Sequence, residues 1–266
     1  MENVPPLPGV EDVPELFEHG HLWIQELVAG TPLRFRLEPT GQITFADHHR
    51  RIDDVPPSLR ASARHVRERL DREALLATGE DPSTVTFVGV ATRFEGIPYD
   101  FERLPPFLGT DVWSTPRGGL QPPDVVERTF ERIGLVPVNA LQKEVDATHF
   151  DVEGYEIPAS NWYDGPAGGV VFRNKRGTRA ALRNPTAVIE PEPLPGEPDT
   201  LAEAVVTTGR VRRATEQLDE SRRKTEPDPV FELVLEAVAR EEHLRLPDVE
   251  ERAFRSAVAE RVAERD

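Results

Sequence analysis

The sequence predicts an α+β fold in which an antiparallel β-sheet domain is followed by a small helical domain. Short apolar runs with strand-like alternation are concentrated before residue 190. A Pro- and Glu-rich segment at 190–196 then has the composition of a linker. Beyond it, apolar residues recur at helical spacing. We therefore expect a loose lead-in over 1–20, a sheet domain over 21–190 and a helical domain over 200–266.

The sheet domain is predicted from seven short apolar runs and two helical patterns. The runs predict strands at 22–28, 33–37, 42–46, 85–90, 108–113, 168–173 and 179–182. Turn-forming residues at 38–41 and 174–177 join two pairs of these strands as hairpins. Ser58 can cap a helix over 58–78 that Gly79 ends, and Pro123 opens a second helix that Gly134 ends. Residues 157–164 are expected to be irregular.

The C-terminal part is predicted to be helical throughout. Helices are expected near 200–220, 228–245 and 247–265. The middle one carries apolar residues at a spacing of about 3.6 residues, at Phe231, Val234, Leu235 and Val238. Pro229 and Pro247 suit the first turns of the last two helices.

The composition is strongly acidic. The 266 residues include 48 acidic and 32 basic side chains, for a net charge of −16. Only three of the basic residues are lysine, namely Lys143, Lys175 and Lys224. An acidic surface with arginine in place of lysine suits a halophilic cytoplasm, where carboxylates hold water and screening is strong. GC-rich coding DNA explains the same bias, and the two explanations are compatible.

Several classes of protein are disfavoured by the same sequence. No cysteine is present, which excludes disulfides, thiolate chemistry and Cys-based zinc sites. Residues 1–8 lack the basic and apolar regions of a secretion signal, and no apolar run reaches membrane-spanning length. The sequence therefore predicts a cytoplasmic protein without a membrane segment. The acidic balance argues against strong non-specific DNA binding but allows a local basic groove.

Three stretches, taken in order, form an ordered set of motifs. Residues 26–34, Glu-Leu-Val-Ala-Gly-Thr-Pro-Leu-Arg, resemble the first ligase motif, Lys-x-Asp-Gly followed by a basic residue. Residues 87–113 are similar to the segment that runs from Phe-Gly-Glu through Tyr and Leu-Pro to Phe-Asp-Val. Residues 168–173, Gly-Gly-Val-Val-Phe-Arg, resemble the Glu-Gly-Val-Val motif. Taken together, the three stretches resemble the RNA ligases of the covalent nucleotidyltransferase superfamily over roughly residues 20–190.

The resemblance implies a fold and a reaction. The expected fold is the antiparallel-sheet, ATP-grasp-like nucleotidyltransferase core of RNA ligases with a small helical C-terminal domain. In the family, a lysine attacks the α-phosphate of ATP to form lysyl-AMP, and carboxylates place Mg²⁺. The adenylate then passes to an RNA 5′-phosphate, and a 3′-hydroxyl displaces AMP. ATP and Mg²⁺ are expected as cofactors here only if activity is retained.

The reactive groups of that pattern are missing from this chain. The expected nucleophile position holds Leu27, and the motif aspartate is Ala29. The metal-facing glutamates correspond to Val90 and Gly168, and the last-motif lysine falls on or near Ala181. No lysine precedes Lys143, so no register of the first motif supplies an amine. We therefore predict a pseudoenzyme with no catalytic residue and no metal ligand.

Eight residues keep the chemistry of a nucleotide or RNA site. Gly30 keeps the bend, Arg34 holds the basic position after it, and Glu26 lies where relatives contact the adenine. The remaining candidates are basic side chains suited to a phosphate or an RNA backbone, namely Arg50, Arg51, Lys175, Arg176 and Arg179. Arg34 also fits a solvated strand face, and Lys175 and Arg176 also fit an exposed hairpin tip.

Three functional hypotheses follow. The leading one is an RNA-ligase-like module that binds a nucleotide, an RNA end or a protein partner without forming lysyl-AMP. The second is an active nucleotidyltransferase whose nucleophile is displaced to Lys175 or His48. The third is a structural or regulatory module that binds no nucleotide. His48 and His49 invite a metal site, but adjacent side chains point apart and make a poor chelate.

Overall fold

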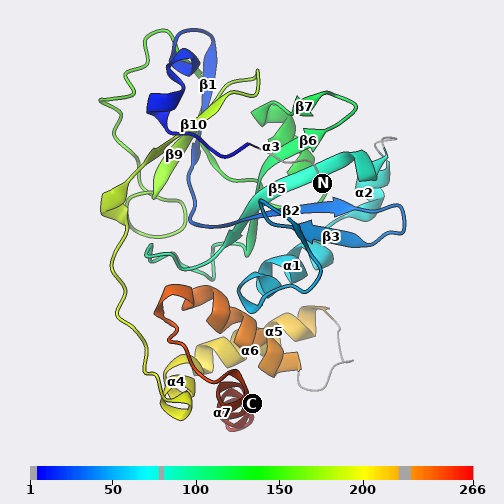
Figure 1. Cartoon of the computed structure of the whole chain (residues 1–266), viewed down its shortest axis with the longest axis vertical. Helices are drawn as coiled ribbons and strands as arrows, with labels where there is room; N and C mark the ends of the chain where they lie inside the picture. The colour runs from blue at the N-terminus through cyan, green and yellow to red at the C-terminus, as the bar shows by residue number, and fades with distance from the viewer. Residues whose placement is uncertain (1–4, 78–80, 222–228, 266) are drawn as a thin grey trace. The chain divides into compact units, whose positions relative to one another are not determined.

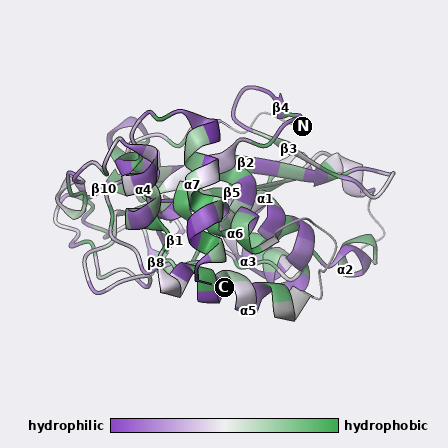
Figure 2. Cartoon of the chain, turned by 90° about the horizontal axis from the view of Figure 1, so that it is seen from below, coloured by the Kyte–Doolittle hydropathy of each residue, from purple (hydrophilic) through white to green (hydrophobic). Residues whose placement is uncertain are grey.

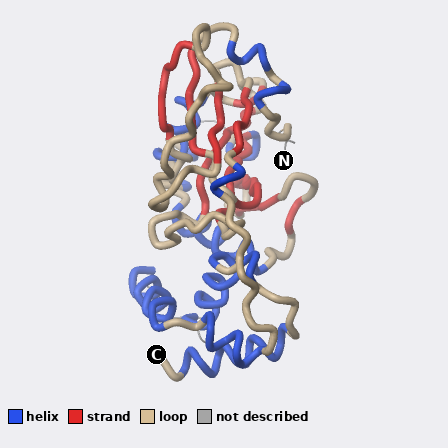
Figure 3. Tube along the Cα trace, turned by 90° about the vertical axis from the view of Figure 1, so that its left-hand side faces the viewer, coloured by secondary structure: helices blue, strands red, loops and turns tan. Residues whose placement is uncertain are grey.

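The computed structural model of the chain describes residues 5–77, 81–221 and 229–265. It divides into two compact units. Unit 1 contains Met1–Val55, Ser62–Thr92 and Ile97–Ile189, and unit 2 contains Pro56–Ala61, Arg93–Gly96 and Glu190–Asp266. The strands belong to unit 1, whereas the described residues after 190 form helices and connecting loops (Figure 3). The predicted α+β class with C-terminal helices is confirmed.

Unit 1 contains a four-stranded antiparallel sheet, sheet A, in the order β10-β9-β1-β8 (Figure 1). Its strands are β1 (His21–Glu26), β8 (Ala140–Asp146), β9 (Gly169–Arg173) and β10 (Arg179–Arg183). On one face of this sheet, Leu22, Ile24 and Phe172 are fully buried. The apolar run predicted at 22–28 forms the strand β1, which both β8 and β9 flank.

Sheet B has six antiparallel strands in the order β4-β3-β2-β5-β6-β7 (Figure 1). These are β2 (Gly30–Leu37), β3 (Ile43–Ala46), β4 (Arg51–Ile52), β5 (Val85–Thr92), β6 (Phe107–Ser114) and β7 (Gly119–Leu120). Its core is aromatic. The rings of Phe35 and Phe87 stack at 4.9 Å between centroids, and Phe87 meets Phe130 edge-on at 5.9 Å. Phe130 comes from the helix α3 (Pro123–Arg132), which thereby covers this face.

The helix predicted over 58–78 is interrupted. It forms α1 (Pro57–Arg69) and α2 (Arg72–Leu76), and its expected end at Thr78 and Gly79 lies outside the described residues. Asp71 separates the two because its carboxylate accepts the amide hydrogen of Ala74 and so caps α2. The prediction of one uninterrupted helix was therefore wrong.

The N-terminal segment 1–20 was expected to be a loose lead-in, but its described residues make ordered contacts with sheet A. Pro8 O accepts a hydrogen bond from Ala181 N at 2.8 Å, and Gly9 bridges to Ala181 in parallel fashion. Leu16, in the short 3-10 helix Pro14–Phe17, is fully buried. The segment therefore extends sheet A beside β10 and closes one side of its core.

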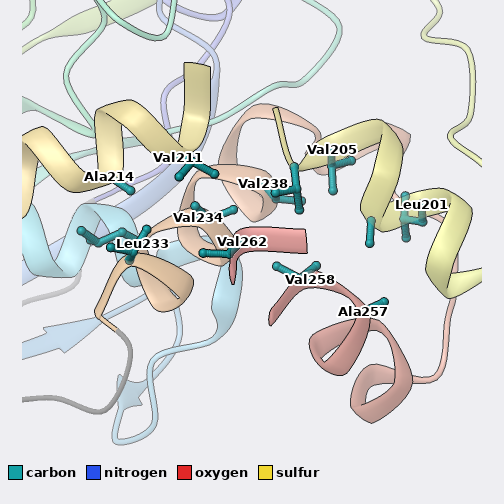
Figure 4. Packing of buried hydrophobic residues seen from close by; sticks show 13 residues of the cluster. Leu201, Val205, Val211, Ala214, Leu233, Val234, Val238, Ala257, Val258 and Val262 are labelled. Atoms are coloured by element: carbon teal, nitrogen blue, oxygen red, sulfur yellow. The ribbon is translucent and has the colours of Figure 1, made fainter. Parts of the chain in front are cut away.

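In unit 2, the described residues after 190 form four α-helices and a 3-10 turn. They are α4 (Pro198–Val205), α5 (Thr208–Ser221), α6 (Pro229–Glu241), the turn His243–Arg245 and α7 (Glu251–Ala263). Each α-helix carries both hydrophilic and hydrophobic residues (Figure 2). Their apolar sides meet in one cluster that includes Leu201, Val234 and Val258 (Figure 4). The predicted stripe on α6 supplies Val234 and Val238 to it.

Within the described residues, none of the helices combines the length and the apolar character needed to cross a bilayer.

Candidate functional site

The bend after β1 is fixed by backbone contacts. Leu27 N donates to Gly169 O at 3.0 Å, and Ala29 N donates to the Tyr99 hydroxyl at 3.1 Å. Gly30 begins β2 with φ of 152°, in a region where side chains are strained, and a Cβ there would clash with the carbonyl of Ala91. The sequence therefore predicts the bend correctly, and glycine is the residue that the close approach requires.

The surroundings of this bend are hydrocarbon. Val28, Val90, Ile97 and Tyr99 are all buried and belong to one apolar cluster. A Cβ added at Gly168 would lie 2.5 Å from Ile97 Cδ1, so Ile97 occupies the space beside this glycine. None of these side chains, apart from the hydroxyl of Tyr99, carries a group able to transfer a proton or bind a cation.

Glu26 is the buried carboxylate of this region. It is 1% exposed and accepts hydrogen bonds from Ser160 Oγ at 2.5 Å, Asn139 Nδ2 at 2.9 Å and Asn161 N at 3.1 Å. Trp162 Nε1 donates to Asn139 Oδ1 at 3.2 Å and steadies the same network. The irregular segment predicted at 157–164 thus supplies two of the donors. The Glu26 carboxylate is hydrogen-bonded to groups of the protein itself.

A second cluster lies where the two sheets meet. The strand register aligns Arg51, Ala46, Arg34, Val88 and Asp111 in one row across sheet B. Because directly paired residues share a face of a sheet, Arg34 and Asp111 project from the same side. Two sequence candidates, Arg34 and Arg51, are therefore brought onto one face.

Asp111 receives two arginines from sheet A, and we call these three residues the Asp111 triad. Arg173 Nη2 pairs with one carboxylate oxygen, and Arg179 Nη1 pairs with the other at 2.6 Å. Arg173 also donates to Gln25 Oε1 at 3.1 Å and to the carbonyl of Thr110. Burial lowers the pKa of Arg173 to about 9 and that of Arg179 to about 10. Arg179 was expected from the sequence, but its two partners were not.

Arg34 shares a face of sheet B with Asp111, and His48 interacts electrostatically with Arg179 of the triad. Arg34 is 5% exposed and donates through Nε to the carbonyl of Asp47 at 2.9 Å. Burial lowers the pKa of Arg34, while the charge of Asp47 opposes that change. Burial also lowers the pKa of the His48 imidazole, and the positive charges of Arg34, His49 and Arg179 add to the effect. His48 therefore lies within electrostatic range of an arginine from each sheet.

The other candidates lie apart from this cluster or face solvent. Arg50 is exposed, and its backbone amide caps Asp47 at 2.8 Å. Arg176 is exposed at the β9–β10 hairpin, where its amide donates to Asn174. Lys175 Nζ pairs with Glu144 at 2.7 Å, and this contact raises the pKa of the lysine.

Asp111 and Arg173 were missed because each belongs to an apolar strand, Asp111 within β6 and Arg173 at the end of β9. The patterns of β6 and β9 predict buried strands, and a charged residue within such a run is the available signal. A buried charge needs a partner of opposite charge, so both positions could have been marked as half of an ion pair. The partner itself was not predictable, since the strands are 62 residues apart in sequence.

Among the described residues, no group of three or more His, Asp or Glu side chains is placed to hold a metal ion. The rings of His48 and His49 are 6.3 Å apart between centroids.

The chain was compared with known proteins by sequence and by structure. No family model and no curated protein matches the sequence. Solved structures of a Naegleria gruberi RNA ligase do match. The ligase with PPi has a TM-score of 0.52 and 13% identity, covering 70% of this chain and 56% of that one. A point mutant of the same ligase with ATP and Mn has a TM-score of 0.53, 12% identity, and coverages of 70% and 57%.

The fold is like that of an RNA ligase. The likeness covers the antiparallel sheets of a nucleotidyltransferase domain and confirms the fold expected from the three sequence stretches. This chain spans a little over half the length of the ligase that it matches. At this level of identity the likeness concerns the fold alone.

Proposed function

We propose that the chain is an RNA-ligase-like protein that has lost lysyl-AMP formation and keeps the fold to bind a nucleotide, an RNA end or a protein partner. One observation carries this proposal: the 27–30 bend is packed in hydrocarbon, with Leu27 where the nucleophile is expected. The nearest buried carboxylate, Glu26, accepts hydrogen bonds from the protein's own side chains and backbone. A leucine has no lone pair with which to attack phosphorus.

The displaced-nucleophile alternative receives no support from Lys175. An amine nucleophile needs a lowered pKa, so that the neutral form is populated near pH 7. The pKa of Lys175 is raised by the hydrogen bond and the charge of Glu144. Lys143 is also paired, with Glu127 at 2.7 Å. His48 remains a candidate for this alternative.

The decisive experiment is an adenylation assay. Purified protein is incubated with α-labelled ATP or GTP and Mg²⁺ or Mn²⁺, and covalent label is read after denaturing electrophoresis. We expect no labelled band. A stable band would contradict the proposal, and mass spectrometry of the adduct would then test Lys175 and His48 directly.

Matched variants sharpen this assay. The double change Leu27→Lys, Ala29→Asp restores the first motif, and we expect it to remain inactive because Val90 and Gly168 still supply no carboxylate. Lys175→Ala serves as the control for the displaced nucleophile, and it should leave the result unchanged. The third hypothesis, a module without nucleotide binding, would be supported if calorimetry at high salt detects no binding of ATP, GTP or 5′-phosphorylated RNA.

The proposed setting is a halophilic cytoplasm. It is supported by the excess of 48 acidic over 32 basic residues and by the near-absence of lysine. Each assay above should therefore be run at the high salt concentration of such a cytoplasm. Salt screens exposed charges, so results at low salt would not represent that setting.

A further inference from the structure

A short irregular loop, residues 158–167, folds back on itself beside the end of β1. Its two ends are joined by an antiparallel bridge between Ala159 and Pro166. Between them, Trp162 packs against the apolar cluster that borders the 27–30 bend. We call this segment the Trp162 loop. A short loop whose ends are joined is a compact unit that covers whatever lies beneath it.

The indole of Trp162 is held in the way that a protein holds a bound ring. It packs against the apolar cluster of Val28 and Ile97, and its Nε1–H donates to Asn139 Oδ1 at 3.2 Å. Asn139 Nδ2 donates in turn to the buried carboxylate of Glu26 at 2.9 Å. Apolar walls with a few fixed polar groups are the usual composition of a small-molecule site. The indole therefore fills, from within the chain, surroundings suited to a planar nitrogen-containing ring.

The Trp162 loop is fastened to the neighbouring 97–104 segment by two hydrogen bonds. Arg103 Nη2 donates to Asn161 O at 2.7 Å, and Asp100 N donates to Trp162 O at 2.8 Å. The Arg103 contact is exposed to solvent, and Trp162 is only partly buried. Segments held by exposed hydrogen bonds and few buried contacts open at a lower free energy than the core of a fold. The loop can therefore open while the two sheets stay folded.

We propose that the Trp162 loop is an autoinhibitory contact: its indole occupies the ring-binding part of a nucleotide site beside the 27–30 bend, and a ligand ring enters only when the loop swings away. This inference rests on the proposed function, because it assigns a control to the nucleotide binding proposed there. An open loop leaves Asn139 Oδ1 without its donor. The site therefore favours a planar ring that carries an N–H group, such as a purine with an amino group.

An internal occupant and a part of the binding site give opposite results when Trp162 is removed. A site that is open in only a fraction of the molecules has its apparent affinity reduced by that fraction. Removal of an occupying indole therefore raises the affinity for a ligand ring. Removal of an aromatic side chain on which the ligand stacks lowers the affinity instead. The direction of the change decides between the two roles.

The test is a calorimetric titration of the full-length protein with adenosine at constant high salt. Trp162→Ala should bind adenosine at least about tenfold more tightly than the parent protein. Trp113→Ala is the matched control, because Trp113 is also partly exposed but lies on β6, and its affinity should equal that of the parent. Equal or weaker binding of adenosine by folded Trp162→Ala would overturn the autoinhibitory contact.

A second variant keeps the indole and loosens the loop. Arg103→Ala removes the exposed contact with Asn161 O, so it should raise the affinity for adenosine about two- to fivefold. It should also speed the solvent exchange of the Trp162 indole N–H, measured by NMR. Arg128→Ala removes an exposed arginine of α3 and should change neither quantity. Because Arg103 is exposed, its variant is expected to fold even if Trp162→Ala does not. Indole exchange and adenosine affinity that both match the parent in Arg103→Ala would also overturn the proposal.

Failure of this inference is distinguishable from failure of the proposed function. A labelled band in the adenylation assay would contradict the loss of lysyl-AMP formation, whatever the Trp162 loop does. Adenosine affinity that does not rise in Trp162→Ala would overturn the autoinhibitory contact and would leave the adenylation result unchanged.

Discussion

Asp111 connects the two sheets of unit 1. It lies on β6 of sheet B, and both of its arginine partners lie on sheet A. Exposed ion pairs in the same unit, such as Arg128 with Asp124, lie in solvent where their attraction is screened. The buried ion pairs of Asp111 therefore matter for the fold, whereas exposed pairs such as Arg128 with Asp124 contribute little to its stability.

Replacement of this carboxylate should be strongly destabilising. In Asp111→Asn, the two buried guanidinium groups lose their charged partner, and we expect the free energy of unfolding to fall by about 3–5 kcal/mol. The measurement is chemical denaturation at pH 7. Asp124→Asn is the matched control, because it breaks the exposed pair and should cost less than about 1 kcal/mol. Similar losses in the two variants would contradict the special role of the triad.

The reactive positions show how far single residues could be predicted from the sequence. The bend at Gly30 was predictable because a glycine ends an apolar run there. The partners of Glu26 were not, because Asn139, Ser160 and Asn161 come from segments more than 100 residues away. Local patterns identify a buried carboxylate, but its contacts depend on the tertiary fold.

At the scale of elements, strands with two apolar faces were predicted well, as was the edge strand β10, whereas β4, β7 and β8 at the other sheet edges were missed. β1, β5 and β9 are largely buried apolar runs, and each was expected near its observed bounds. β8, at the edge of sheet A, was missed because most of its residues are exposed or partly exposed and polar. Its sequence carries no alternation that would distinguish a strand from a polar loop.

The predicted helix boundaries were wrong where a capping side chain interrupts a continuous helical pattern. One helix was expected over 200–220, and the structure has α4 and α5 with Thr207 between them. The hydroxyl of Thr207 accepts the amide hydrogen of Arg210 at 3.2 Å and so begins α5. Neither glycine nor proline stands between these helices to signal the break.

The break between α1 and α2 has a tertiary cause that can be tested. Asp71 N donates to Ile133 O at 2.8 Å, and a Cβ on Gly134 would lie 2.6 Å from Arg69 O. The end of α3 therefore packs against the break. Asp71→Ala removes the cap of α2, and we expect a loss of about 1 kcal/mol in the free energy of unfolding. Glu73→Ala, on the same exposed turn without a capping contact, should cost clearly less in the same denaturation experiment.

At the scale of the whole molecule, two kinds of charged group behave differently: exposed carboxylates, which repel one another, and buried side chains, which form ion pairs. The net charge is −16, so the exposed carboxylates repel one another on average. Buried pairs behave differently. In unit 2, Arg210 bonds to Glu241 at 2.8 Å and to Glu242, and these side chains are at most 13% exposed. Salt screens the exterior strongly and such interior pairs weakly.

Salt should therefore stabilise the protein. Raising the salt concentration from 0.1 to 1 M shortens the Debye length from about 10 to about 3 Å and suppresses repulsion between exposed carboxylates. We expect the melting temperature to rise by several degrees, since each 1 kcal/mol corresponds to roughly 2–4 °C for a chain of this size. The measurement is a thermal melt at a series of KCl concentrations.

A less acidic variant separates this electrostatic effect from general salting-out. Asp53, Asp54 and Glu153 are all exposed, so Asp53→Asn, Asp54→Asn, Glu153→Gln removes three negative charges with little change in packing. The variant should be more stable than the parent at 0.1 M KCl and should gain less from added salt, because less repulsion remains to be screened. Parallel curves for parent and variant would assign the salt effect to stronger burial of apolar surface. A melting temperature that falls with salt would mean that screened ion pairs outweigh the net repulsion, contrary to the halophilic setting proposed above.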